Sequence, residues 1–402
     1  MSNRSVSFHH ALLAVCAACS TSPGTAHVQL DLAAGWTGTA EVLVHDPTGA
    51  LVSRAPITAS LDVAVKPGDT VTVATRAAGL TYLESTLAVA PGDVVEVDVA
   101  PPPVTPATSP VPIVFPITAA TSWTAASPFD NQWAQLPTDP ELSFPLGMTT
   151  FPIVAATYGD SGPLAMYGDR DVTIDNEDAT TIDLTADAIP WQADTITMTN
   201  APETAWASVD VNFGANFLYL GAPSNVTAIP TGLGDSADLG ASGIDPSGML
   251  VEIDSRVALP APAATTFDLA APDLPQVSAL AIGSGEATWQ LAGGSDYKRV
   301  YFGFESSTDS TFAWDFAGPP GTDSVALPQL PSDYAPPAFD ELGVSVDRRS
   351  DLPSYVTGSF HYIPLPIGAG FELRNVSSAP PGSARRAPVS ARSSTEKSAP
   401  SR

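Results

Sequence analysis

Cysteine, histidine and lysine are scarce in this chain. Its 402 residues include only two cysteines, five histidines and three lysines. Both cysteines stand near the N-terminus, so the rest of the chain has no thiol for a disulfide framework, a cysteine-type zinc site or a redox motif. Long apolar runs are missing too, because no stretch approaches the ~20 residues that a membrane-spanning helix needs.

Long helices are also disfavoured by the composition. The chain contains 40 prolines and 30 glycines, and a proline inside a helix costs about 3 kcal/mol. Hydrophobic residues make up 44% of the sequence, which is enough to build buried cores. We therefore expect an all-β protein of two or three β-sandwich modules, joined by proline-rich linkers and flanked by disordered termini.

Basic side chains are few and unevenly placed. Five of the sixteen follow residue 375 and one precedes residue 20, so the body between carries 10 basic and 42 acidic residues, a formal charge of −32. A field of this sign repels nucleic acid and anionic lipid headgroups, so neither is expected as a ligand of the body. We expect residues 376–402, rich in serine, alanine, proline and arginine, to form a disordered basic tail.

The N-terminal residues have the pattern of a signal peptide. Arg4 precedes the apolar run at 11–19, and a polar, turn-rich segment follows at 20–24. A basic residue, a short apolar region and small residues before a cleavage point characterise export signals. Small residues before a cysteine resemble the signal of bacterial lipoproteins, in which that cysteine becomes the lipidated first residue of the mature chain.

Two cysteines compete for the lipid. Ala17 and Ala18 supply the small residues before Cys19, so residues 1–19 are interpreted as the signal region and Cys19 as the lipidation site. Cys16 is the runner-up. An ordinary secretory signal, cleaved near Ala18 or Ala26, is the alternative. The signal, the excess of arginine over lysine and the strand pattern together resemble lipoproteins of myxobacteria and similar high-GC Gram-negative organisms.

Residues 27–100 predict a small β-sandwich. Alternating apolar strands flank two Pro-Gly-Asp turns, at 67–69 and 91–93. Proline presets φ for the first turn position and glycine tolerates the positive φ of the second. This pattern is similar to immunoglobulin-like or carboxypeptidase-regulatory-like modules. Residues 101–112 then form a proline-rich linker.

Two further β regions follow. In 113–260 we expect hairpins over 172–184 and 209–220, a strand at 249–253 and a long glycine-rich surface loop at 232–248. In 261–375, short strands separated by Gly-, Ser- and Pro-rich turns resemble fibronectin-like modules. Trp289 and Trp314 fall in these strands and are expected in the core.

Catalytic signals are weak. Residues 159–163 resemble a shortened trypsin-type nucleophile loop around Ser161. That chemistry requires a histidine base and an orienting carboxylate. Only His27, His45 and His361 remain after the signal, and they come from distant segments. We therefore expect no enzymatic activity, with a secreted hydrolase as a remote alternative.

Two binding hypotheses remain open. Acidic residues cluster at Asp169, Asp171, Asp175, Glu177 and Asp178, and Ca²⁺ prefers such oxygen ligands, although the chain has no EF-hand loop. Solvated strand faces are the simpler interpretation of this cluster.

Tryptophans suggest a second kind of site. Trp123, Trp133 and Trp191 lie in Pro- and Thr-rich segments where partial exposure would let them stack on sugar rings. The sequence as a whole predicts an exported, lipid-anchored β-protein at the bacterial outer membrane or cell surface. Its role is structural, adhesive or binding, with a membrane contact through the lipid. Envelope polysaccharide or another envelope protein is the expected partner, and a carbohydrate- or calcium-dependent module is the alternative.

Overall fold

The structure is a computed structural model. It describes residues 24–377 apart from 33–37, 78, 100–107, 118–119, 128–130, 146–147, 161, 176–180, 214–215, 220–225, 232–233, 262–263, 271, 310 and 352–366. Within these residues every regular element is a β-strand, which confirms the all-β prediction. No helix in this part of the chain is long and apolar enough to cross a membrane.

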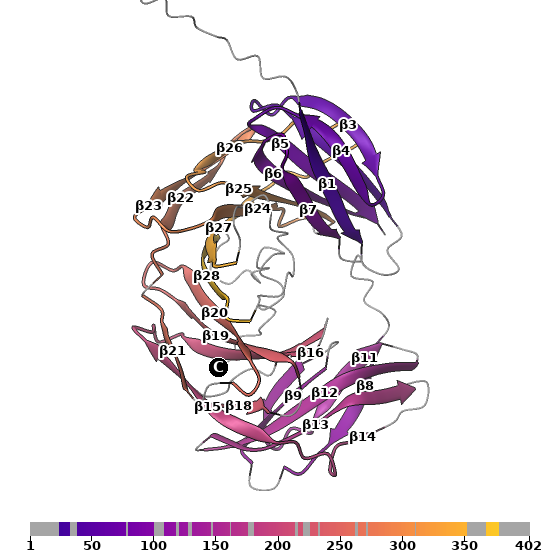
Figure 1. The fold of residues 1–402 in the computed structure, drawn as a ribbon, viewed down its shortest axis with the longest axis vertical. Coiled ribbons are helices and arrows are strands. Elements are labelled where there is room, and N and C mark those ends of the chain that lie inside the picture. Colours follow the sequence, from indigo (N-terminus) through magenta and orange to yellow (C-terminus); the bar gives the residue numbers. More distant parts are fainter. Residues whose placement is uncertain are drawn as a thin grey trace, which may run out of the picture.

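A twelve-stranded sheet runs through the whole molecule (Figure 1). Its strands, in spatial order, are β17 (Asn216–Tyr219), β16 (Trp206–Phe213), β19 (Ser236–Ile244), β20 (Leu250–Ala258), β28 (Gly370–Ser377), β27 (Glu341–Arg349), β24 (Arg299–Glu305), β25 (Phe312–Gly318), β6 (Leu80–Val89), β5 (Asp69–Ala77), β2 (Thr39–His45) and β3 (Leu51–Ile57).

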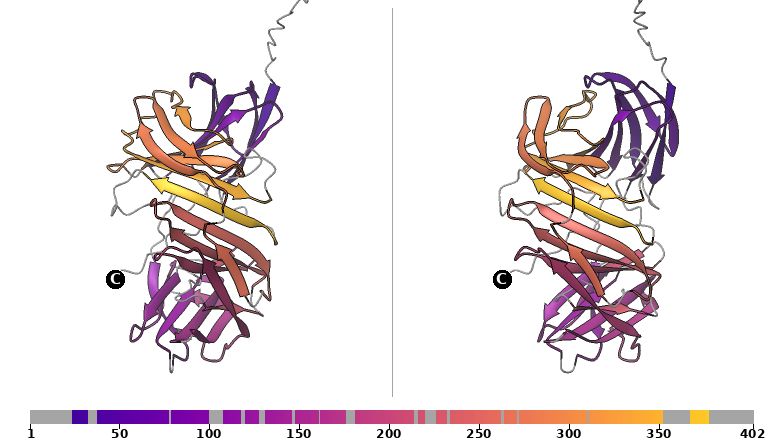
Figure 2. Two further views of the ribbon diagram at one scale, coloured as in Figure 1. Left: turned by 90° about the vertical axis from the view of Figure 1, so that its left-hand side faces the viewer. Right: turned by 60° about the vertical axis from the view of Figure 1, so that its left-hand side comes forward.

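This sheet crosses the expected divisions of the chain. β25 pairs with β6 in parallel, from Phe312↔Thr81 to Ala317↔Thr86. β20 pairs with β28 antiparallel, from Leu250↔Asn375 to Ser255↔Gly370. One hydrogen-bonded sheet therefore contains strands from all three expected segments, 27–100, 113–260 and 261–375. The segments are joined by this sheet as well as by the chain that connects them. The side views show these strands stacked along the long axis of the molecule (Figure 2).

The first module is a sandwich at one end of the molecule. A sheet of β4 (Ser60–Val65), β1 (Gly24–Leu32) and β7 (Val94–Val99) packs on β2, β3, β5 and β6. Buried valines from both sheets fill the space between them, including Val28, Val42, Val71 and Val95. These valines come from the alternating positions that the sequence pattern predicts.

Both expected turns of this module are present. Gly68 and Gly92 each adopt a φ of +95°, which glycine tolerates at no steric cost. In each turn the aspartate carboxylate accepts a hydrogen bond from a backbone amide three residues earlier: Asp69 from Lys66 and Asp93 from Ala90, both at 2.8 Å. The two equivalent turns are confirmed, but neither closes a hairpin: β4 and β7 pair with β1, whereas β5 and β6 belong to the large sheet. Each turn therefore leads from one sheet of the sandwich to the other.

Two sheets make a second sandwich at the opposite end. One contains β11 (Glu141–Pro145), β8 (Thr108–Val114) and β14 (Ile182–Asp183), and the other β10 (Asn131–Gln135), β9 (Ser122–Ala126), β12 (Met148–Gly159) and β13 (Gly162–Asp175). Their core contains Phe144 stacked on Phe151 at 4.8 Å between ring centroids. The hairpin expected over 172–184 is wrong, because β14 pairs in parallel with β8 instead of returning along β13.

Two smaller sheets cover the large one. β22 (Gln276–Ile282), β23 (Glu286–Ala292) and β26 (Ser324–Ala326) enclose a core with Phe302 and Phe316, whose rings stack at 4.9 Å. Trp289 and Trp314 are 3% and 2% exposed in this core, as predicted. β18 (Val226–Pro230), β15 (Trp191–Thr199) and β21 (Ala264–Asp268) share a further core with β16, β19 and β20.

The glycine-rich interval 232–248 is not the expected surface loop. Residues Ser236–Ile244 form β19, a largely buried strand between β16 and β20. A Cβ on Gly240 would lie 2.1 Å from Asp254 Oδ1 and 2.4 Å from Ser208 Oγ. Glycine here therefore makes room for polar side chains on the neighbouring strands rather than marking a turn. The predicted β16–β17 hairpin and the strand at 249–253 are both present.

Candidate functional site

Several of the predicted site residues lie outside the described part of the chain. These are Cys16, Cys19, Ser161, Glu177, Asp178 and His361. Lipidation and the serine-nucleophile hypothesis therefore stay predictions. In the sequence, Ser161 falls between β12, which ends at Gly159, and β13, which begins at Gly162.

The two described histidines occupy different environments. His27, on β1, is partly exposed, and its Nδ1 lies 2.8 Å from Asp62 Oδ1. His45 ends β2 and is fully buried, with Nε2 3.0 Å from the backbone carbonyl of Gln329. Burial lowers the pKa of His45, so its neutral form is favoured. Its contact holds two distant segments together.

The acidic cluster is only partly described. Asp169 and Asp171 are exposed on β13, where the Asp171 amide donates to Asp169 Oδ1 at 3.0 Å. Asp175 is the last residue of the same strand. Among the described residues, no group of three or more His, Cys, Asp or Glu is arranged to hold a metal ion. The calcium hypothesis therefore gains no support from this part of the chain.

Trp123 is not available for sugar stacking. It is completely buried on β9, in the interior of its sheet, and its Nε1 donates to the Thr138 carbonyl at 2.9 Å. The expectation of partial exposure is wrong, because the facing sheet of the sandwich covers β9. That sheet contributes Val111 from β8 and Phe144 from β11 to the same core. Trp191 is half-buried and packs on the core beneath β15. Trp133 lies on β10, an edge strand.

The most extensive polar site is a junction that the sequence did not reveal. We call Glu41, Arg54, Arg76, Asp333 and Tyr334 the clamp. Arg54 on β3 donates to both oxygens of Glu41 at 2.7 and 2.9 Å, and to both oxygens of Asp333 at 2.8 and 2.7 Å. Arg54 and Asp333 are 279 residues apart in sequence. Two-pronged arginine–carboxylate contacts fix orientation as well as distance.

An aromatic contact completes the clamp. The guanidinium carbon of Arg76 lies 3.6 Å from the centroid of the Tyr334 ring, and Arg76 also donates to the Asp333 backbone carbonyl at 3.1 Å. The Tyr334 hydroxyl donates to Glu41 at 3.2 Å. A cation over a ring face is stabilising, more so when the pair is shielded from water.

The electrostatics of the clamp follow from these contacts. The hydrogen bond from Arg54 is the main cause that lowers the pKa of Asp333 to about 2 and also lowers that of Glu41. Burial, followed by the Glu41 charge, raises the pKa of Tyr334 to about 12. At neutral pH the cluster therefore contains two cations, two anions and a neutral phenol.

Backbone contacts extend the junction. Gln329 donates its amide to the Gly49 carbonyl at 2.8 Å, and its own carbonyl faces His45. Residues 329–334, between β26 and β27, therefore lie against β2, β3 and the turn that joins them. The clamp links the first module to the third module, which is the segment 261–375, independently of the β6–β25 pairing.

A second set of polar contacts lies on one face of the large sheet. On β24, Val300 and Phe302 point into the core, so Arg299 and Tyr301 point to the opposite face. Arg299 forms an ion pair with Asp347 on β27, and both are almost completely buried. These contacts connect neighbouring strands, as expected of cross-strand pairs.

The same face carries two further cross-strand contacts. Tyr82 on β6 donates to Asp315 on β25 at 3.0 Å. Arg256 on β20 forms an ion pair with Asp238 on β19 at 2.5 Å. The polar face therefore stabilises the sheet through several of its strands.

Sequence reasoning missed these residues because their partners are remote in the chain. One signal was present in the sequence. The body has only 10 basic residues against 42 acidic ones, so each arginine has many carboxylates to pair with, and most of the described arginines do form ion pairs. Those that do are Arg54, Arg76, Arg256, Arg299, Arg348 and Arg349.

The geometry defines a class: an elongated all-β protein whose modules share one sheet and are held by a clamp. No protein-family model matches the chain, and no curated protein matches it in sequence. Its function is therefore inferred from its own residues.

Proposed function

We propose that the protein is an exported, lipid-anchored and non-catalytic structural component of the bacterial cell envelope, with an adhesive or binding role at the outer membrane or cell surface. The observation that carries the structural role is the twelve-stranded sheet that joins the modules. Separate modules on flexible linkers would reorient independently, whereas modules that share backbone hydrogen bonds move together.

The clamp supports the same role. It adds a second connection between the first and third modules, made of charged groups, an aromatic contact and backbone bonds. Because the β6–β25 pairing and the clamp are two separate connections, each one restricts rotation of the first module about the other. A stiff, elongated shape suits a protein that holds a binding surface away from a membrane.

The position of β1 fits an anchor at one end. β1 begins at Gly24 and belongs to the module at one end of the long axis (Figure 1). A lipid on Cys19 would be at most about 20 Å from this strand along the chain, at ~3.6 Å per residue. The module of β8 to β14 would then be the part farthest from the membrane. Envelope polysaccharide or another envelope protein is the proposed partner there.

The anchor is tested by labelling with an alkyne fatty acid in a Gram-negative expression host. Cys19→Ala should abolish labelling and move the protein from the detergent phase to the aqueous phase. Cys16→Ala is the matched control, with the same chemical change three residues earlier, and should keep both properties. Labelling that survives Cys19→Ala but is lost in Cys16→Ala would move the anchor to Cys16. Absence of labelling in the parent protein would refute the lipid anchor.

A further inference from the structure

A cavity lies where the β21–β15–β18 sheet meets the large sheet. Its volume is about 320 Å³, near the lower end of the ~300–1,000 Å³ typical of small-molecule sites. It is formed by the segment after β15, the β19–β20 turn, the residues after β21, and side chains of β20 and β28. The lining residues are Asn200, Ala201, Pro202, Gly243, Asp245, Pro246, Val251, Leu269, Ala270 and Arg374.

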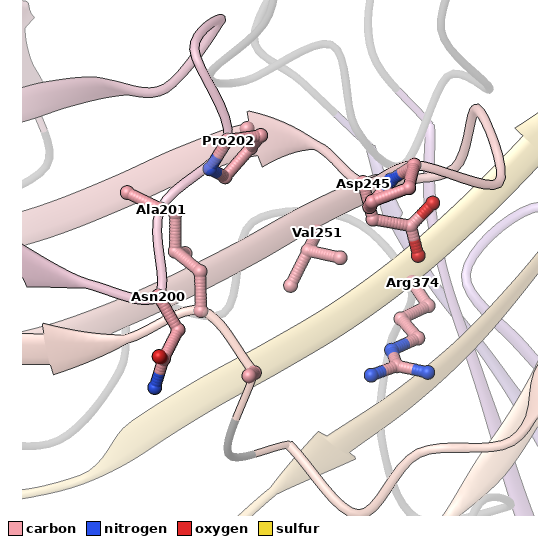
Figure 3. A pocket seen from close by; sticks show the side chains of 10 residues that line it. Asn200, Ala201, Pro202, Asp245, Val251 and Arg374 are labelled. Atoms are coloured by element: carbon pink, nitrogen blue, oxygen red, sulfur yellow. The ribbon is translucent and has the colours of Figure 1, made fainter.

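Most of this lining is apolar. In Figure 3, Asn200 and Arg374 lie on opposite sides of the cavity, with Val251 between them and Asp245 and Pro202 above. Val251 and Leu269 belong to the core beneath the sheet. The cavity is therefore an apolar depression with a cation at one side, a layout that favours an amphipathic ligand.

Arg374 differs from the other partly buried arginines of the described chain. Those arginines form ion pairs with carboxylates, whereas no such pair involves Arg374 within the described residues. Its one hydrogen bond there is long, from Nη2 to the Pro272 carbonyl at 3.4 Å. Its Nε is buried and has no hydrogen-bond partner in the described part of the chain. An unmatched buried donor costs free energy, which an anionic ligand would recover.

The other two polar side chains of the cavity, Asp245 and Asn200, take part in structural bonds. Asp245 Oδ1 accepts from the Ser247 amide and hydroxyl and from the Met249 amide, at 2.8, 2.5 and 3.1 Å. Asp46 makes the same three contacts in the β2–β3 turn. This carboxylate therefore shapes a hairpin turn.

Asn200 is held in a similar way. Its amide donates to Asp268 at 2.8 Å, and its backbone adopts a φ of +50°. Asparagine tolerates this left-handed conformation better than most residues. Arg374 is thus the cation of the cavity lining and a hydrogen-bond donor that remains open to a ligand.

We propose that this cavity binds a small organic carboxylate with an apolar body. The carboxylate would accept two hydrogen bonds from the Arg374 guanidinium, whose planar fork matches it. The apolar body would lie against Val251, Leu269 and Pro202. The volume admits a single small molecule and excludes a polysaccharide chain, so this site is separate from any polymer contact in the proposed function.

The test uses 4-fluorobenzoate and 4-fluorobenzyl alcohol as probes, followed by ¹⁹F NMR titration of the full chain. The acid should bind saturably and more tightly than the uncharged alcohol of nearly equal size. Its affinity should fall as ionic strength rises, because salt screens partly exposed charge pairs. Arg374→Gln should weaken binding of the acid about tenfold or more, since a hydrogen bond to a charged group is lost.

Two more variants separate binding from folding. Arg170→Gln makes the same charge change at an exposed arginine away from the cavity and should leave binding unchanged. Ala270→Phe fills the mouth from an exposed position and should abolish binding of both probes without loss of thermal stability. The proposal is overturned if neither probe binds saturably, if Arg374→Gln binds the acid as the parent does, or if Ala270→Phe retains full affinity.

Discussion

Arg76 lies over the face of the Tyr334 ring, with 3.6 Å between the guanidinium carbon and the ring centroid. The two residues come from the first and third modules, from β5 and from the segment before β27. Tyr334 is 5% exposed, so the ring is held between the arginine and the protein surface beneath. The contact makes Tyr334 the apolar centre of the clamp, surrounded by charged groups.

Removing this ring should weaken the junction. We expect Tyr334→Ala to lower the free energy of unfolding by about 3 kcal/mol, as for other large-to-small changes at buried aromatics. Tyr334→Phe keeps the ring and loses only the hydroxyl contact to Glu41, so its loss should be about 1 kcal/mol. Urea unfolding followed by tryptophan fluorescence measures both. Equal losses in the two variants would mean that the ring contributes nothing.

The clamp should also make stability sensitive to acid. The pKa of Asp333 is lowered to about 2 from an ordinary value of 3.8, mainly by Arg54. A lowered folded-state pKa gives stability that is present above pH 3.8 and is lost as the pH falls toward 2. Asp333→Asn should therefore flatten the thermal stability profile between pH 4 and pH 2. Glu286→Gln, at an exposed carboxylate on β23, serves as the control. An unchanged slope in Asp333→Asn would contradict the clamp's role.

Local features of this fold could be predicted from the sequence, because they depend on neighbouring residues. The Pro-Gly-Asp turns at Gly68 and Gly92 have the positive φ that their composition predicts. Trp289 and Trp314 fall in strand patterns, and both are buried. In each case the signal lies within a few residues, where period-2 burial and turn chemistry operate.

Long-range pairings could not be predicted in the same way. β6 and β25 are strands of mixed apolar and polar residues, and nothing in either one specifies that they pair in parallel with each other. The clamp joins Arg54 to Asp333 across 279 residues, so no local spacing reveals it. The burial of Trp123 could not be predicted either, because its neighbours in sequence are largely polar while its neighbours in space are apolar.

The Arg299–Asp347 pair provides a test of the polar face. Both residues are almost completely buried, and burial raises the pKa of Asp347 despite the nearby arginine. Arg299→Met should cost about 3–5 kcal/mol, because it leaves a buried carboxylate without its cation. The double variant Arg299→Met/Asp347→Leu should recover most of the loss, which denaturant unfolding would measure.

The pH dependence gives this test a second readout. Without Arg299 the pKa of Asp347 should rise further, since the arginine charge is the largest cause that lowers it. A raised folded-state pKa means that protonation favours the folded state. The deficit of Arg299→Met should therefore shrink as the pH falls, and that of the double variant should not. A deficit independent of pH would argue against an unpaired carboxylate as its cause.

Gly240 tests why a glycine-rich segment forms a buried strand. A Cβ at this position would lie 2.1 Å from Asp254 Oδ1 and 2.4 Å from Ser208 Oγ, so Gly240→Ala forces polar side chains of two adjacent strands to move. We expect a loss of about 1–3 kcal/mol, the usual cost of overpacking. Gly370→Ala is the matched control on β28, where the nearest atom, the Asp254 carbonyl oxygen, is 3.6 Å from the added Cβ. Thermal unfolding of the two variants should therefore separate them, because only the first meets atoms closer than van der Waals contact. Equal melting temperatures would mean that the neighbours of Gly240 can move aside freely, and that glycine is not required there.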